Sequence, residues 1–203
     1  MKGKCISVAT LLAVCLFASA ASAERLNLSH PHYPLVASDF IDVTYEPTGG
    51  GGGGGILTAI GYSAELNMDE GSSETLYGDF ILTVDINPAT GEATGGTLEV
   101  TEDYVTGVQL FYSEQLTAFG WGTLAGDDIF ECVFAQQGNM LAPDGEPVGV
   151  IMATVGAAAP WDFSNSFDNG SGNGYSKTFY LPEPSVGALL TVFGLGLLRR
   201  RCR

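Results

Sequence analysis

The sequence predicts an all-β fold, a single antiparallel β-sandwich or partly closed barrel of about eight or nine short strands. Short runs rich in Val, Ile, Thr, Tyr and Phe recur along the middle of the 203-residue chain, a composition typical of strands. Turn-forming residues separate these runs. No stretch keeps the 3.6-residue period of an amphipathic helix. Together these features favour short strands joined by turns over helices.

The predicted strands follow one another in order. The first, residues 39–47, alternates so that Ile41, Val43 and Tyr45 share one face, as in a half-buried strand. The remaining runs lie at 56–66, 76–86, 95–101, 107–113, 116–124, 128–136, 146–155 and 175–181. The runs are not near-identical, so the sequence does not predict a solenoid or propeller.

Glycine marks the predicted connections. Residues 49–55 are all glycine, a run that holds neither helix nor strand and predicts a flexible hairpin loop or linker. A phosphate-binding loop is excluded, because Ile56 and Leu57 follow instead of the required Lys and Ser or Thr. The stretch 85–96 predicts a turn between two strands, with Gly91 able to adopt a positive φ.

Residues 1–23 have the features of a secretory signal peptide. Lys2 and Lys4 precede an apolar segment over 6–18, and Ala21 and Ala23 form a small-residue cleavage site for signal peptidase. We therefore expect the exported protein to begin at Glu24. The alternative, an uncleaved membrane helix, is disfavoured because the apolar segment is short and the cleavage site follows directly.

The C-terminal segment, residues 182–203, has three parts in order. A rigid motif (Pro182, Glu183 and Pro184) precedes the apolar run 186–198, and a basic cluster (Arg199, Arg200, Arg201 and Arg203) follows it. As a helix the thirteen-residue run covers about 20 Å at about 1.5 Å per residue, whereas a hydrocarbon core is about 30 Å thick. We expect a short transmembrane helix with the arginines in the cytoplasm and residues 24–181 outside.

This three-part arrangement resembles the PEP-CTERM sorting signal of bacterial exported proteins. The resemblance covers the tail only; the middle of the chain has just the general look of the small all-β bodies that carry this signal. It implies an exosortase, a membrane-embedded transpeptidase-like enzyme, that recognises and removes the tail. It also implies a Gram-negative cell that makes exopolysaccharide, with the protein destined for the cell envelope, surface or extracellular matrix. The alternative is an ordinary single-pass anchor, for which the apolar run is short.

The part between these two ends is strongly acidic. It holds about 160 residues, enough for one domain with a core. All 23 acidic residues of the chain lie between Glu24 and Glu183, where only Arg25 and Lys177 are basic, so the net charge there is near −21. Such a field repels phosphate backbones and excludes nucleic-acid partners.

The sequence gives little support for a catalytic activity. Cys132 is the one cysteine left after removal of both ends, so no intramolecular disulfide is expected, and its apolar neighbours predict a buried, inert thiol. His30 and His32 flank a proline near the predicted mature N-terminus without a third metal ligand nearby. No nucleophile elbow or zinc-protease motif occurs. We therefore expect a non-enzymatic protein without a cofactor.

Two kinds of ligand contact remain open. Asp127, Asp128 and Asp168 are weak calcium-ligand candidates, although the loop starting at Asp85 fails the EF-hand pattern, and solvated surface acid is the favoured interpretation. Trp161 precedes an Asp/Asn/Ser-rich stretch and is the candidate sugar-stacking platform, although packing in the core or against a loop is the favoured interpretation. Trp121 lies in an apolar alternating run that favours the core.

The favoured function is that of an exported, exosortase-sorted envelope or matrix component linked to exopolysaccharide or biofilm. The alternative is a carbohydrate-binding module with Trp161 as its platform, and a secreted hydrolase is the third hypothesis. The expected partners are signal peptidase and exosortase during export, and exopolysaccharide afterwards.

Overall fold

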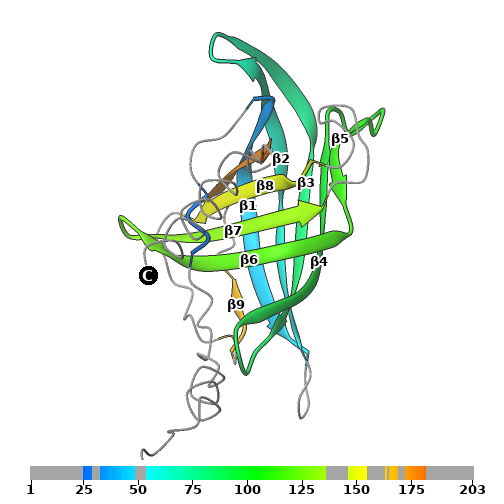
Figure 1. Ribbon diagram of the computed structural model, residues 1–203. Coiled ribbons are helices and arrows are strands. Elements are labelled where there is room, and N and C mark those ends of the chain that lie inside the picture. Colours follow the sequence, from blue (N-terminus) through cyan, green and yellow to red (C-terminus); the bar gives the residue numbers. More distant parts are fainter. Residues whose placement is uncertain are drawn as a thin grey trace, which may run out of the picture.

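The computed structural model describes residues 25–28, 33–48, 54–135, 146–154, 163, 165–168 and 172–181. Ten strands form one antiparallel sheet in the spatial order β5-β4-β3-β2-β1-β10-β8-β7-β6, with β9 pairing β1 (Figure 1). The strands are β1 (Leu35–Pro47), β2 (Gly55–Asp69), β3 (Ser72–Asn87), β4 (Glu92–Thr101), β5 (Gln109–Ser113), β6 (Gln115–Leu124), β7 (Asp127–Ala135), β8 (Val148–Thr154), β9 (Phe167–Asp168) and β10 (Gly174–Tyr180).

The predicted antiparallel all-β fold is confirmed, and each of the nine predicted runs overlaps one strand. Two details of the prediction were wrong. The strands number ten, because the two-residue β9 has no recognisable run of its own. They are also not uniformly short, since β1, β2 and β3 have 13, 15 and 16 residues. The predicted signal peptide and C-terminal helix lie outside the described residues.

Two of the predicted connections are also located. Pro47 pairs with Gly55, so the glycine run joins β1 to β2 as a hairpin, with residues 49–53 outside the described part. In the turn between β3 and β4, Gly91 has a φ of 72° and its N–H donates to the Asn87 carbonyl at 2.7 Å. A residue with a side chain is disfavoured at such a φ, which is why the turn places glycine there.

The sheet bends so that its first and last strands approach each other without closing. β5 and β6 are consecutive in the chain, yet β5 pairs with β4 whereas β6 pairs with β7. The buried Ser113 holds this corner: its hydroxyl donates to the Ala135 carbonyl, and the Gln115 N–H donates to Ser113 Oγ at 3.1 Å. Beyond the corner β6 leaves β4, and a depression of about 370 Å³ separates Glu92–Gly95 from Leu116–Phe119.

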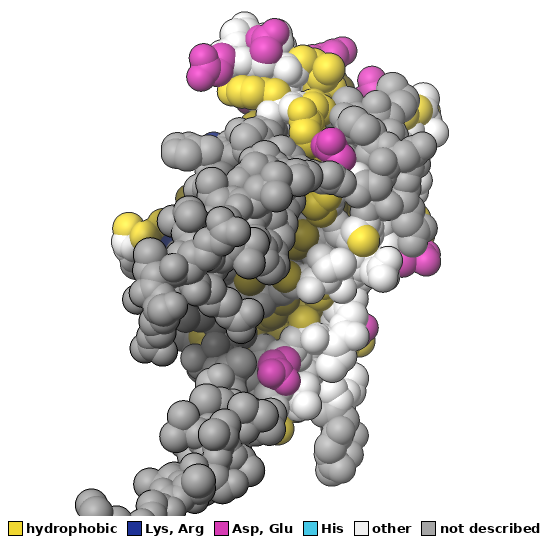
Figure 2. Space-filling view, in the orientation of Figure 1, with side chains coloured by type: hydrophobic (Ala, Val, Ile, Leu, Met, Phe, Trp, Pro, Cys, Tyr) yellow, Lys and Arg dark blue, Asp and Glu magenta, His cyan; other side chains and the backbone are white. Residues whose placement is uncertain are grey.

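Acidic side chains project from the described surface at several places, among them the β2–β3 hairpin at the top of the view (Figure 2). The excess of acidic residues is therefore carried largely by the solvent-facing side of the sheet. Among the described residues two acidic side chains are exceptions: Asp128 and Glu131, both on β7, are buried, with exposed fractions of 1% and 0%.

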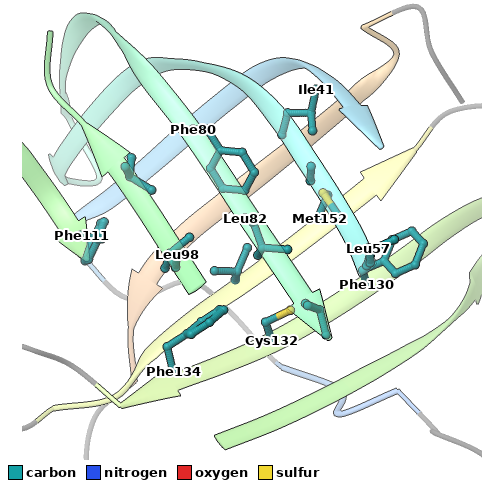
Figure 3. Packing of buried hydrophobic residues seen from close by; sticks show 14 of the residues in the cluster. Ile41, Leu57, Phe80, Leu82, Leu98, Phe111, Phe130, Cys132, Phe134 and Met152 are labelled. Atoms are coloured by element: carbon teal, nitrogen blue, oxygen red, sulfur yellow. The ribbon is translucent and has the colours of Figure 1, made fainter. Parts of the chain in front are cut away.

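The core lies between the two halves of the bent sheet. Figure 3 shows Leu82 and Leu98 on one side, facing Phe130, Cys132 and Phe134 from β7 on the other. Ile41, Val43 and Tyr45 are all fully buried, which confirms the predicted inner face of the first strand. Full burial of side chains of this size stabilises the fold by about 1.5–3 kcal/mol each.

Residues 25–28 cover the outer side of β7 through Glu131. The Arg25 guanidinium donates to Glu131 Oε1 at 3.0 Å, and the N–H groups of Asn27 and Leu28 donate to the same carboxylate at 2.9 and 3.2 Å. Glu131 is completely buried and Arg25 is 21% exposed. A buried carboxylate is tolerated only when its charge and lone pairs are satisfied, and this segment satisfies both.

Candidate functional site

Four exposed aromatic side chains surround one depression on the outer side of the sheet. Phe40, Tyr62, Tyr77 and Tyr104 are 69%, 59%, 68% and 67% exposed; we call this set the aromatic surface. The depression has a volume of about 440 Å³, and its lining is completed by Asp39, Ser63, Ala64, Thr75 and Leu76. Large exposed apolar side chains that cluster in one patch often mark an interaction site, whereas single scattered ones do not.

The alternation of β2 places Tyr62 on this surface. Its neighbours Gly61 and Ser63 are buried on the inner side of the sheet, so Tyr62 points outward. The Ser63 hydroxyl donates to the Thr101 carbonyl at 2.5 Å and ties β2 to the end of β4. The ring of Tyr62 is thus carried by a paired strand, which is a rigid support for a binding group.

The loop between β4 and β5 brings Tyr104 beside Tyr77. The Tyr77 N–H donates to the Glu102 carbonyl and the Tyr104 N–H donates to the Tyr77 carbonyl, both at 3.1 Å. The end of β4, from which the loop starts, lies so close to β3 that a Cβ on Gly78 would stand 2.0 Å from the Thr101 carbonyl oxygen. Within the loop, Asp103 Oδ1 accepts from the Val105 N–H at 2.6 Å. Backbone contacts therefore fix the spacing of the two tyrosines.

Phe40 lies at a break in the pairing of β1. The register shifts between Asp39 and Asp42, and Phe40 adopts a φ of 55°. A bulky residue with this φ is a genuine outlier, and its strain costs about 1–2 kcal/mol. The bulge keeps Ile41 buried while the Phe40 ring faces solvent. Strain retained at an exposed aromatic residue is typical of a functional position.

Carboxylates flank the centre of the aromatic surface. In the pairing register, Asp39 on β1 and Asp79 on β3 lie directly opposite Tyr62 from its two sides. Side chains in such positions have Cβ atoms about 4.5–5.5 Å apart. The aromatic surface therefore presents flat apolar rings beside hydrogen-bond acceptors.

This combination offers contacts that a sugar can use. Aromatic rings offer flat platforms with electron-rich faces, and carboxylates accept hydrogen bonds from hydroxyl groups. The depression's lining residues include no histidine, cysteine or lysine. Across the described part of the chain, no group of three His, Cys, Asp or Glu side chains stands close enough to hold a metal ion.

The predicted site residues are not brought together. Trp161, His30 and His32 lie outside the described residues, as do the cleavage-site residues Ala21 and Ala23 and the whole sorting motif with its arginines. Asp128 is buried at the start of β7 and Asp127 beside it is half-buried, whereas Asp168 is exposed on β9. β9 pairs with the edge of β1 that also pairs with β10. Among the described residues no group of three acidic side chains stands close enough to hold a metal ion, so these three aspartates are not brought together as a calcium site.

Cys132 and Trp121, both of which the sequence favoured for the core, lie in or against the core. Cys132 is 1% exposed, and burial raises the pKa of its thiol, so it stays protonated at neutral pH. Trp121 packs partly buried against the core, with its ring 5.4 Å from that of Phe163 in an edge-to-face contact. The interpretation of Cys132 as a buried thiol is confirmed.

Sequence reasoning missed the aromatic surface. A signal was present in the first predicted strand: if Ile41, Val43 and Tyr45 face the core, Phe40 is forced outward or into a bulge. Nothing local indicated that Tyr77 and Tyr104, from different parts of the chain, would join it. Their approach depends on the pairing of β3 with β4 and on the following loop.

No family model, curated protein or solved structure matches this chain. Among the residues that the structure describes, no helix is long and apolar enough to span a membrane.

Proposed function

We propose that this protein is a non-enzymatic, exported polysaccharide-binding component of the cell envelope or extracellular matrix. The observation that carries the proposal is the aromatic surface: four exposed rings around an apolar depression, carried by paired strands and a hydrogen-bonded loop. Sugar rings have apolar C–H faces that stack on aromatic side chains, and their hydroxyl groups donate to nearby carboxylates. In this proposal the aromatic surface takes the role that the sequence suggested for Trp161.

The binding test compares two outward-facing residues of the same strand. We expect Tyr62→Ala to weaken polysaccharide binding by about 1–3 kcal/mol, roughly ten- to a hundredfold, because an aromatic anchor is lost. Ile60 is also exposed on β2, at 53%, but does not line the depression, so Ile60→Ala is the matched control. A glycan array followed by titration calorimetry measures both. Equal binding by wild type and Tyr62→Ala, or no binding to any glycan, contradicts the proposal.

Delivery to the cell surface is the second part of the proposal, and it is supported by the tail sequence. The Pro182-Glu183-Pro184 motif, the short apolar run and the arginine cluster resemble an exosortase substrate. Replacing the three motif residues with alanine is expected to leave a full-length, membrane-retained precursor, as is deletion of the exosortase. Intact-mass measurement of the envelope protein decides the matter: a wild-type mass that includes Arg203 contradicts sorting and indicates a permanent anchor.

A further inference from the structure

We propose that the polysaccharide taken by the aromatic surface is a cationic amino-sugar polymer, one with free ammonium groups, rather than a neutral or acidic glycan. This inference rests on the proposed function, because it names the ligand class of the same site. Its basis is the juxtaposition of Tyr62 with Asp39 and Asp79 in a surface that has no basic side chain among its lining residues.

The two carboxylates are placed to receive a cation over the Tyr62 ring. Asp39 and Asp79 stand opposite Tyr62 on the neighbouring strands, within about 4.5–5.5 Å of it at Cβ. A cation is attracted to the face of an aromatic ring within about 6 Å of its centroid. An ammonium group on a sugar stacked against Tyr62 therefore meets the ring and a carboxylate on either side at the same time.

Neither basic side chain of the described residues, Arg25 or Lys177, forms an ion pair with Asp39 or Asp79. Arg25 donates to Glu131 on β7. Lys177, on β10, lies opposite Ala37 of β1, and Ala37 in turn lies opposite Glu65 of β2. With a net charge near −21 over residues 24–183, the surrounding field attracts cationic polymers and repels polymers of uronic acids or sulfated sugars.

The amine also distinguishes this ligand from a neutral glycan. A hydroxyl group donates one hydrogen bond to a carboxylate, whereas an ammonium group donates three and adds a charge. The apolar wall of the depression, which includes Leu76 and Ala64, reduces the access of water and strengthens those contacts. A neutral sugar keeps the stacking on the ring but loses the charge-dependent part of the binding free energy.

The test uses two oligosaccharides with the same backbone. A soluble glucosamine oligomer, protonated at mildly acidic pH, is compared with its fully N-acetylated counterpart by titration calorimetry on the full-length protein. We expect the cationic oligomer to bind about tenfold more tightly at low salt. This advantage should shrink when sodium chloride is raised from about 0.05 M to about 0.5 M, because salt screens exposed charges.

The chain provides a closely matched control for the carboxylates. Ile56 on β2 is flanked in the same way by Glu46 on β1 and Asp85 on β3, but it does not line the depression. Asp39→Asn with Asp79→Asn removes two charges beside Tyr62, and Glu46→Gln with Asp85→Asn removes two charges beside Ile56. The first pair should abolish the preference for the cationic oligomer; the second should leave it intact. Thermal melts confirm that both variants fold.

Each outcome bears on the proposal. Loss of the preference in the Asp39/Asp79 variant alone supports it. Equal loss in both variants, or cationic binding that survives Tyr62→Ala, overturns it and indicates attraction by net charge. A neutral oligomer that binds as tightly as the cationic one also overturns it, but leaves the proposed polysaccharide-binding function standing. If neither oligomer nor any other glycan binds, both proposals fail.

Discussion

The outer faces of β2 and β7 differ in their exposure to solvent, although both strands belong to one sheet. On β7 the outer face is sealed: Glu131 is fully buried beneath residues 25–28 and Ile129 is 5% exposed. On β2 the corresponding face is open: Ile56, Ile60 and Tyr62 are 40–59% exposed. The sealed face carries a charge and the open face carries apolar side chains, the reverse of what solvation alone favours.

Under the proposed function, the two faces serve different purposes. The covering of β7 satisfies a buried carboxylate and so contributes to stability. The aromatic side chains next to β2 gain nothing from exposure to water, and Phe40 adds backbone strain. A feature that costs stability and is held in place by hydrogen bonds is consistent with the binding role that we propose for this face.

The largest expected effect comes from opening the sealed face. Arg25→Ala removes the cation that donates to Glu131 at 3.0 Å, and the carboxylate is left buried without its counter-charge. We expect the free energy of unfolding to fall by about 3–5 kcal/mol, measured by urea denaturation. Adding Glu131→Gln should restore part of this loss. A loss below about 1 kcal/mol would mean that Glu131 does not depend on the segment.

A smaller effect is expected from crowding the same contact. A Cβ on Gly122 would stand 2.8 Å from Arg25 Cγ, so Gly122→Ala should destabilise the protein by about 1–3 kcal/mol. In the Arg25→Ala background the added methyl group meets no obstacle, and the cost should vanish. A double-mutant cycle of the two substitutions measures the coupling free energy between Arg25 and position 122 directly. Additive losses would show that Arg25 does not pack over β6.

The open face should respond in the opposite direction. Asn tolerates a positive φ much better than Phe, and Phe40 is 69% exposed with a φ of 55°. We therefore expect Phe40→Asn to stabilise the protein by about 1 kcal/mol while weakening glycan binding. Thermal denaturation and calorimetry on the same samples test both changes. A destabilised variant would show that the Phe40 ring contributes packing, and would weaken the argument from strain.

The smallest effect concerns the exposed turn at the end of β2. Asp69 Oδ1 accepts from the N–H groups of Gly71 and Ser72 at 2.8 and 2.9 Å, and the bond from Gly71 is the main cause that lowers the pKa of Asp69 below its ordinary value of 3.8. A lowered folded-state pKa contributes stability above the unfolded-state pKa, and this is lost as the pH falls through the folded value. Thermal melts at pH values from above 3.8 to below it should show a smaller decrease in melting temperature with falling pH for Asp69→Asn than for wild type. Parallel curves would contradict the prediction.

Much of the fold was predictable because it depends on local pattern. The alternation in the first predicted strand correctly placed Ile41 and Tyr45 in the core, and the turn with Gly91 follows from local backbone chemistry. The burial of Cys132 followed from its apolar neighbours. The lengths of β2 and β3 were less predictable, because mostly polar residues at 67–75 continue the pairing into a long hairpin.

By itself the sequence determined which segments are strands, which face of most of them is apolar, and the excess of negative charge. These properties depend on the order of neighbouring residues, so they are present before the chain folds. Only the tertiary structure decided that Phe40, Tyr62, Tyr77 and Tyr104 share one surface, and that Glu131 is buried while Asp39 is exposed. Those outcomes depend on strand register, a bulge and a covering segment. Each of these is a contact between residues far apart in the chain, and local periodicity carries no information about such contacts.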